Sequence, residues 1–170
     1  MKLSKKNQIL SKELTIKKIN RISHEILERN FEEKELVLAG IDPCGYTLAQ
    51  LFKSKLEEIS KTKITLIKVS LDKLAPLQSE IKLDCDIKVI SKKPVILVDD
   101  VLNTGRTLAY SFKPFLTSEV KNLQVAVIVD RDHKTFPVHA DYVGYSLSTS
   151  LQEHVKVELT DKDKIGVYLA

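Results

Sequence analysis

An apolar run that ends in two adjacent carboxylates constrains the fold of this chain more than any other feature of its sequence. Residues 95–98 are continuously apolar and rich in β-branched side chains. Such a run predicts a strand that is buried on both faces, as in a parallel sheet. Open parallel sheets bind ligands beyond the carboxyl ends of their strands, which is where we expect Asp99 and Asp100 to lie.

The loop after the acidic pair has the residue types of a phosphate site. It contains Asn103, Thr104, Gly105, Arg106 and Thr107, and a helix is expected from about residue 108. Gly105 allows close approach to a ligand or a positive φ, and the free N–H groups of a helix N-terminus favour an anion. Neighbouring carboxylates can accept hydrogen bonds from a vicinal diol or hold a divalent cation. Together these features predict a ribose 5-phosphate site, against the alternative of an ordinary strand end with solvated carboxylates.

Other phosphate-binding classes lack support in the sequence. Neither G-x-x-x-x-G-K-[ST] nor G-x-G-x-x-G occurs in it. Because these patterns build the phosphate sites of P-loop proteins and dinucleotide enzymes, we do not expect either class.

Length and composition fit one domain, which we predict to span residues 1–170. No apolar run is long enough to cross a bilayer, and no apolar signal segment follows the basic first residues, so we expect a cytoplasmic protein. Cys44 and Cys85 lack metal-ligand spacing and are expected to be free thiols. The net charge of +4 suits an anionic substrate or RNA without distinguishing between them.

The hydrophobic pattern alternates between strands and helices. Helices are predicted over residues 15–30, 46–59 and 107–116, and strands over 35–41, 64–69, 95–98, 125–129, 142–145, 155–159 and 165–169. Residues 42–45 read as a turn, and residues 70–93 as irregular with weak strand signals near 83–89. This order predicts an α/β fold with a central, mainly parallel sheet flanked by helices. The irregular and terminal pieces are expected to form a small hood over its carboxyl edge.

Three stretches resemble a known family. Residues 95–107 resemble the phosphoribosyl-diphosphate binding signature of type I phosphoribosyltransferases. Residues 21–30 and 125–144 resemble the bifunctional pyrimidine-operon attenuation regulators and uracil phosphoribosyltransferases, and the resemblance extends over residues 19–168. It implies the type I fold and transfer of ribose 5-phosphate from phosphoribosyl diphosphate to a base, implied to be uracil, with release of diphosphate.

The resemblance also implies roles for the acidic pair and its loop. Asp99 and Asp100 would hold the ribose hydroxyls, directly or through metal-bound water, and are the expected catalytic residues and magnesium ligands. The loop from Asn103 to Thr107 would bind the 5-phosphate mainly through backbone N–H groups. The neutral amide of Asn103 does not supply a general base.

Departures from the family concern the diphosphate. The diphosphate loop corresponds to Ile41, Asp42, Cys44 and Gly45, where the family usually has basic residues. A carboxylate beside a polyanion is unfavourable unless a metal lies between them. The loop over residues 68–83, which would close over the substrate, is shorter than in the family and has no arginine. Lys68, Lys73 or Lys82 could substitute as point charges. We expect these departures to affect catalysis more than ligand binding.

The resemblance also implies a pocket for the base. Asp130, Arg131 and His133, which follow one predicted strand, would face this pocket, and Tyr142 and Val143 would lie at the start of the next strand. Tyr142 would stack on the base and Val143 would contact it through backbone; a core position for Tyr142 is the alternative.

RNA binding is possible but not favoured. Lys17, Arg21 and His24 share one helix face, and the resemblance adds a basic patch near Lys134 and His139. Glu25 and Glu28 flank that face, so a solvated helix face is the simpler interpretation. Three functions stay open: a uracil phosphoribosyltransferase that forms a homodimer or tetramer, a weakly or non-catalytic nucleotide-sensing RNA-binding regulator of pyrimidine genes, and a phosphoribosyltransferase for another base.

Overall fold

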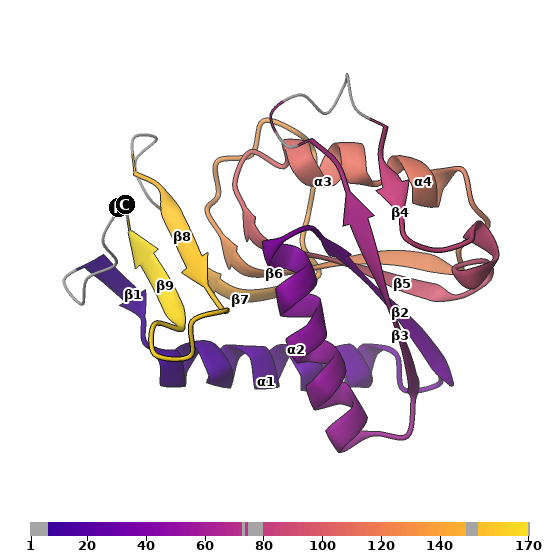
Figure 1. Cartoon of the computed structure of the whole chain (residues 1–170), viewed down its shortest axis with the longest axis horizontal. Helices are drawn as coiled ribbons and strands as arrows, with labels where there is room; N and C mark the ends of the chain where they lie inside the picture. Colours follow the sequence, from indigo (N-terminus) through magenta and orange to yellow (C-terminus); the bar gives the residue numbers. More distant parts are fainter. Residues whose placement is uncertain (1–6, 73, 75–79, 149–152, 170) are drawn as a thin grey trace.

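A six-stranded, mainly parallel sheet forms the centre of the computed structural model, which describes residues 7–72, 74, 80–148 and 153–169 (Figure 1). Its strands are β2 Glu35–Ile41, β3 Lys63–Ser70, β4 Lys82–Leu83, β5 Pro94–Leu102, β6 Asn122–Asp130 and β7 Tyr142–Ser146. They lie in the order β4-β3-β2-β5-β6-β7, and only β4 runs antiparallel to its neighbour. The predicted α/β class with a mainly parallel sheet is confirmed.

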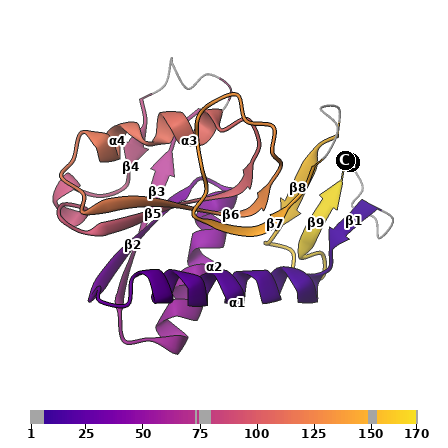
Figure 2. The same ribbon diagram turned by 180° about the vertical axis from the view of Figure 1, so that it is seen from behind.

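Helices cover both faces of this sheet. The helices α1 Lys12–Arg29 and α2 Cys44–Ile59 lie on one face, and α3 Arg106–Ser111 and α4 Lys113–Leu116 on the other (Figures 1 and 2). In β2, Leu36 and Leu38 pack toward α1 and α2, whereas Val37 and Ala39 pack toward the opposite face. Alternate residues of a strand point to opposite faces, so a strand covered on both sides needs a continuous apolar run.

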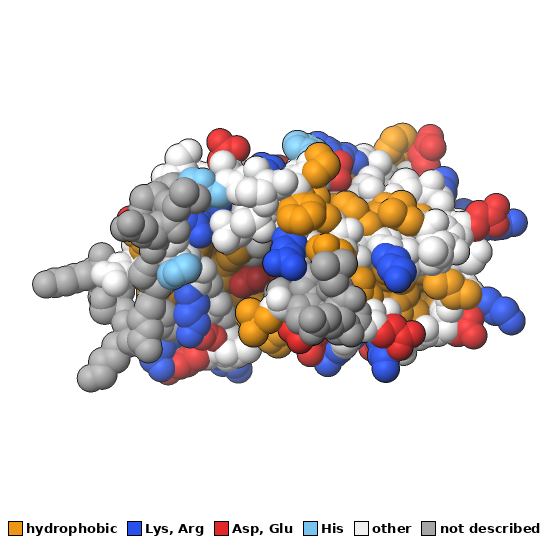
Figure 3. Space-filling view, turned by 90° about the horizontal axis from the view of Figure 1, so that it is seen from above, with side chains coloured by type: hydrophobic (Ala, Val, Ile, Leu, Met, Phe, Trp, Pro, Cys, Tyr) orange, Lys and Arg blue, Asp and Glu red, His pale blue; other side chains and the backbone are white. Residues whose placement is uncertain are grey.

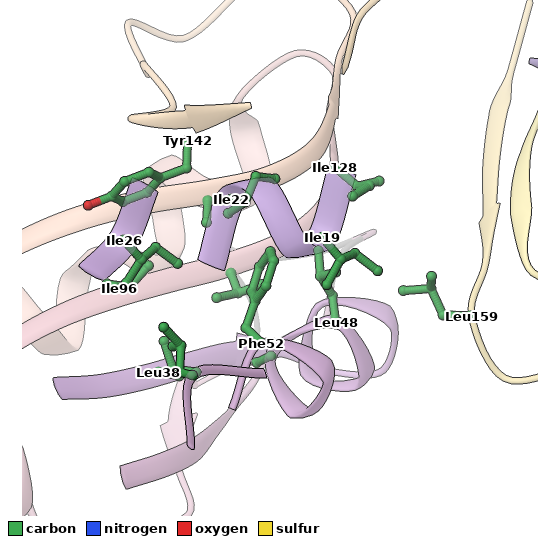
Figure 4. Packing of buried hydrophobic residues seen from close by; sticks show 14 of the residues in the cluster. Ile19, Ile22, Ile26, Leu38, Leu48, Phe52, Ile96, Ile128, Tyr142 and Leu159 are labelled. Carbon is green, nitrogen blue, oxygen red and sulfur yellow. The ribbon is translucent and has the colours of Figure 1, made fainter. Parts of the chain in front are cut away.

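The two faces differ in how completely they are covered. Under α1 and α2, Ile22, Ile26 and Phe52 interdigitate and are fully buried (Figure 4). On the other face α3 and α4 are short, so Phe112 and Val89 stay half-buried, and hydrophobic side chains gather on the surface seen from above (Figure 3). No helix in the described part of the chain is long and apolar enough to span a membrane.

The helix predicted over residues 107–116 is divided in two. Phe112 donates its amide to the Leu108 carbonyl at 3.1 Å, and the next helix begins with Phe115 donating to Phe112 at 2.9 Å. Pro114 has no N–H to donate to the carbonyl four residues earlier, so the α-helical ladder stops there.

The two ends of the chain form a second, antiparallel sheet of three strands. It is ordered β1-β9-β8, with β1 Gln8–Leu10, β8 Val155–Glu158 and β9 Gly166–Leu169. This sheet is the hood, but its composition differs from the prediction. The strand at Tyr142–Ser146 belongs to the main sheet, and residues 80–93 supply β4 and a 3-10 helix at Ile87–Val89 instead of hood strands. The contribution of β1 was not predicted.

Candidate active site

The acidic pair lies within β5 instead of beyond its end. Asp99 still pairs with Val127 of β6, and the strand continues to Leu102. Neighbouring strand residues point to opposite faces. Accordingly, Asp99 is 3% exposed and lines a cavity of about 120 Å³, whereas Asp100 is half-buried and does not line it. The Asp99 carboxylate accepts a 3.0 Å hydrogen bond from the Asp100 amide. The cavity therefore receives one carboxylate of the pair.

The loop predicted to bind phosphate forms the remaining wall of this cavity. Residues 101–108 line it together with Asp99. Gly105 has a φ of +82°, which is one of the two roles that the sequence allowed for it, and a Cβ there would lie 3.3 Å from the Phe136 carbonyl oxygen. The amides of Arg106, Thr107 and Leu108 precede the hydrogen bond from Ala109 to the Gly105 carbonyl, so they begin α3 without an intrahelical acceptor. Carboxylate and amides thus meet around one cavity.

Two side chains of this loop interact locally. Thr104 Oγ1 accepts a 3.3 Å hydrogen bond from the Arg106 amide. The exposed Arg106 guanidinium lies 6.0 Å from the centre of the Tyr110 ring, one helical turn further along. An anion would therefore have to compete with Thr104 for one of the loop amides.

The segment after β6 holds the loop in place. The amides of Thr135 and Phe136 both donate to the Thr104 carbonyl, at 2.9 and 3.0 Å, and Arg131 donates its amide to Leu102 at 2.9 Å. Sequence analysis missed this support. Backbone hydrogen bonds between segments 30 residues apart leave no mark in the local pattern of side chains.

The N-terminus of α2 lies directly against the acidic pair. A Cβ on Gly45 would come within 2.3 Å of the Val98 carbonyl oxygen and 2.9 Å of Asp99 Cα, so only glycine permits this approach. The amides of Cys44, Gly45 and Tyr46 precede the 3.1 Å hydrogen bond from Thr47 to Pro43 and therefore belong to the first turn of α2, where backbone N–H groups point out of the helix. The predicted diphosphate loop, which starts at the fully buried Ile41 and includes a cis Asp42–Pro43 bond, is thus placed beside Asp99.

Asp42, the unexpected carboxylate of this loop, forms an ion pair. Its Oδ1 lies 3.3 Å from Lys68 Nζ on the neighbouring β3, and the same ammonium lies 4.7 Å from the centre of the Tyr46 ring. Of the other lysines predicted to replace the missing arginine, Lys82 pairs with Glu80 at 3.6 Å, and Lys73 lies outside the described residues.

Cys44 lies between α2 and the hood. It lines a mostly apolar cavity of about 190 Å³ with Pro43, Thr47 and residues 156–160. The hood therefore reaches the diphosphate loop. Neither cysteine forms a disulfide, as predicted. Burial, with Asp84 and Asp86 nearby, raises the pKa of the Cys85 thiol, which makes it a poor nucleophile.

The two residues predicted after β6 lie at the carboxyl edge of the sheet, but their side chains are engaged. Asp130 accepts from the Asp132 amide at 3.1 Å and from Lys134 Nζ at 2.9 Å. Arg131 is 3% exposed and donates to the Glu153 carbonyl of the hood at 2.7 Å. His133, also predicted on the base side, is half-buried.

The structure does not bring Tyr142 to the cavity. It pairs with Ala126 in the middle of β6, four residues before the edge at Asp130, and is fully buried against Ile26 of α1 (Figure 4). Its hydroxyl accepts from Asn30 Nδ2 at 3.1 Å and donates to Gln124 Oε1 at 3.0 Å, and burial raises its pKa. The core alternative therefore describes Tyr142, and the carboxyl end of β7 is Ser146.

The face of α1 that was considered for RNA binding makes contacts within the protein. Arg21 pairs with Glu25 and donates to the carbonyls of Val143 and Gly144, at 2.7 and 3.1 Å. Lys17 pairs with Glu13 at 2.7 Å. Val143, predicted to contact a base, instead uses its carbonyl to anchor α1. His24 and His139 are exposed.

A magnesium ion in this site would need ligands from the substrate as well as from the protein. Within the described ranges, no group of three or more His, Cys, Asp or Glu side chains is arranged to hold a metal. Magnesium usually takes one or two carboxylates and completes its shell with substrate phosphates and water. Asp99 fits that requirement as a single carboxylate in the cavity, whereas Asp100, predicted as a second ligand, points to the opposite face of β5.

The fold and this site define a class of protein: a parallel-sheet domain whose carboxyl edge places a carboxylate between two amide-lined loops. The Phosphoribosyl transferase domain family matches residues 5–162. Two curated relatives carry the name Bifunctional protein PyrR. The one from Clostridioides difficile is 39% identical over 93% of each chain, and the one from Clostridium kluyveri is 40% identical over 92% of each chain.

Solved structures of phosphoribosyltransferases share this fold. A hypoxanthine-guanine phosphoribosyltransferase from Bacillus anthracis is 25% identical with a TM-score of 0.69, over 87% of this chain and 85% of that one. The Trypanosoma cruzi hypoxanthine phosphoribosyltransferase in complex with IMP, 15% identical, shares the fold with a TM-score of 0.79 over 99% of this chain and 97% of that one. The chain belongs to the phosphoribosyltransferase family, and within it to the group of the bifunctional PyrR proteins.

Proposed function

We propose that this chain transfers ribose 5-phosphate from phosphoribosyl diphosphate to uracil and releases diphosphate. The observation that carries the proposal is the cavity shared by Asp99 and residues 101–108, with the N-terminus of α2 packed at Gly45 against the backbone of Val98 and Asp99. The base is inferred from the resemblance of residues 125–144 to uracil-using relatives. Solved neighbours named for hypoxanthine and guanine make a purine the competing choice.

Each part of the site has a task in such a transfer. The transition state of glycosyl transfer has oxocarbenium character, so a fixed carboxylate near the ribose stabilises developing positive charge. Asp99 would hold the ribose hydroxyls, and the amides of residues 105–108 the 5-phosphate. The amides of Cys44, Gly45 and Tyr46, with Lys68, would receive the diphosphate. Magnesium held by Asp99 would supply charge neutralisation for the diphosphate.

Base recognition would come from the ends of β6 and β7. Leu147 donates its amide to the Asp130 carbonyl at 2.8 Å, which brings residues 146–148 beside Asp130 and Arg131. Backbone groups there would read the base, and the Asp130 and Arg131 side chains, which bond Lys134 and the Glu153 carbonyl, would hold that backbone in place. Tyr142 and Val143 would support this edge from the core.

Incubation of the protein with phosphoribosyl diphosphate, magnesium and one base at a time tests the proposal. We expect release of diphosphate and formation of the nucleotide with uracil, and much less with guanine, hypoxanthine or xanthine. A preference for a purine would keep the reaction and correct the base. No turnover with any of the four bases would sink the enzymatic proposal.

The competing function is a regulator that binds nucleotide and RNA with little catalysis. The carboxylate of Asp42 beside the proposed diphosphate site favours it, as does the name Bifunctional protein PyrR that the relatives carry. A gel shift with the leader RNA of a pyrimidine operon, with and without uridine monophosphate, separates the two functions. Specific binding should weaken as salt is added, because phosphate contacts release counterions.

We further infer a cytoplasmic homodimer or tetramer. Sedimentation velocity over a range of protein concentrations tests the assembly, and a purely monomeric profile at the concentrations used for activity would contradict it.

A further inference from the structure

The ammonium of Lys68 lies beside the predicted diphosphate loop and forms an ion pair with that loop's own carboxylate, Asp42. Asp42 Oδ1 and Lys68 Nζ are 3.3 Å apart, and their side chains are 43% and 36% exposed. The Asp42 amide also donates to the Val69 carbonyl at 2.9 Å, so loop and strand are joined by backbone as well as by charge.

Lys68 is held in place independently of Asp42. Its amide donates to Asp84 Oδ1 at 2.7 Å, and its carbonyl accepts from the Asp84 amide at 3.2 Å. Its ammonium lies 4.7 Å from the centre of the Tyr46 ring, on the first turn of α2. A cation over an aromatic face is attracted to it. The ammonium would therefore remain at the N-terminus of α2 if its ion pair with Asp42 were broken.

An ion pair this exposed is easily exchanged. Exposed pairs contribute about 0–1 kcal/mol, because water competes for both partners. A diphosphate carries several negative charges and would also meet the amides of Cys44, Gly45 and Tyr46. It can therefore displace a single carboxylate from Lys68, but the displacement lowers its net affinity.

We propose that Asp42 is a built-in competitor for the diphosphate group, occupying Lys68 until phosphoribosyl diphosphate or free diphosphate displaces it. The inference rests on the proposed function, because it assigns the diphosphate to this loop. It makes Asp42 a residue that weakens binding of diphosphate-containing ligands selectively. Ligands that carry only the 5-phosphate do not reach Lys68.

Isothermal titration of the full chain with three probes tests this: phosphoribosyl diphosphate, inorganic diphosphate and ribose 5-phosphate. Asp42→Asn should bind the first two about two- to fivefold more tightly, the range expected when a weak, exposed ion pair no longer competes. Its affinity for ribose 5-phosphate should stay within about twofold. Glu57→Gln is the matched control, because it removes a carboxylate paired with Lys53 at 2.6 Å at the far end of the same helix. It should leave all three affinities unchanged.

The double variant separates competition from simple repulsion. In a Lys68→Gln background, Asp42→Asn should raise the affinity for the two diphosphate-containing ligands by less than about twofold, because there is no ammonium to compete for. A gain that persists in full overturns the proposal, since it would come from direct repulsion. Unchanged or weaker binding by Asp42→Asn overturns it too. If the unaltered protein binds phosphoribosyl diphosphate, only this inference then fails; if it binds neither diphosphate ligand, the proposed function fails with it.

Discussion

Asp99 and Asp100 are chemically identical neighbours that the sheet places in different surroundings. Asp99 is buried and lines the cavity, whereas Asp100 is half-buried and lies outside its lining. The reason is that β5 continues through both residues, so their side chains point to opposite faces. Two carboxylates that look like one motif in the sequence are therefore expected to have different roles, with only Asp99 placed in the cavity.

Asp99→Asn should lower kcat/KM for phosphoribosyl diphosphate by about 10²-fold or more, because it removes the charge nearest the ribose. Asn has nearly the same shape and can still accept from the Asp100 amide, so the melting temperature should change little. Asp100→Asn is the matched comparison, and we expect a smaller loss. Steady-state kinetics and thermal denaturation of both variants provide the check; equal losses would contradict the division of roles.

Tyr142→Phe tests the core placement of that side chain. It removes a hydroxyl that bonds Asn30 and Gln124, and should cost about 1 kcal/mol of unfolding free energy. The KM for the base should be unchanged, because the ring is buried away from the cavity. Urea denaturation and base titration measure the two effects. A raised KM at unchanged stability would restore the stacking role.

At the scale of elements, the position of α2 decides the geometry of the loop from Ile41 to Gly45, which we propose binds diphosphate. The helix approaches β5 so closely that the Gly45 backbone touches Val98 and Asp99. A breaker at residue 45 was visible in the sequence as a turn signal. Its second function, contact with a strand more than 50 residues away, was not visible, because such contact leaves no periodic pattern.

Gly45→Ala should therefore harm both stability and function. Its Cβ would meet backbone at 2.3 Å, which cannot rotate away, so α2 must shift. We expect a loss of about 1–3 kcal/mol of unfolding free energy, as for other overpacked sites, and weaker binding of inorganic diphosphate. Cys44→Ala is the control in the same loop: it removes atoms instead of adding them and should retain diphosphate binding. Scanning calorimetry measures the stability of both variants, and titration calorimetry measures their binding of inorganic diphosphate.

At the scale of the whole molecule, the two chain ends meet in the hood. The edge strand β1 pairs with β9, and Leu10 is 4% exposed within the main core cluster. The hood in turn contacts the diphosphate loop through the cavity beside Cys44 and receives Arg131 at Glu153. The first described residues therefore support a site formed by the middle of the chain.

Deletion of residues 1–10 should destabilise the protein by about 2 kcal/mol or more, because it exposes the β9 edge and removes the buried Leu10. Deletion of residues 1–6 is the control, since it leaves β1 in place. Thermal denaturation measures the stability, and the KM values for base and phosphoribosyl diphosphate report on the hood. Identical melting temperatures for the two deletions would show that β1 does not stabilise the hood.

Local sequence was sufficient for the α/β class, most helices and central strands, and the need for glycine at residue 105 in the loop after the acidic pair. These features depend on short-range patterns, namely apolar runs, helical periodicity and breakers. Tertiary structure alone decided that Asp99 and Asp100 face opposite ways, that Tyr142 is core, that Asp42 binds Lys68 and that β1 completes the hood. Each of these depends on which strands and helices become neighbours, and contacts between distant segments are set by packing of the whole chain.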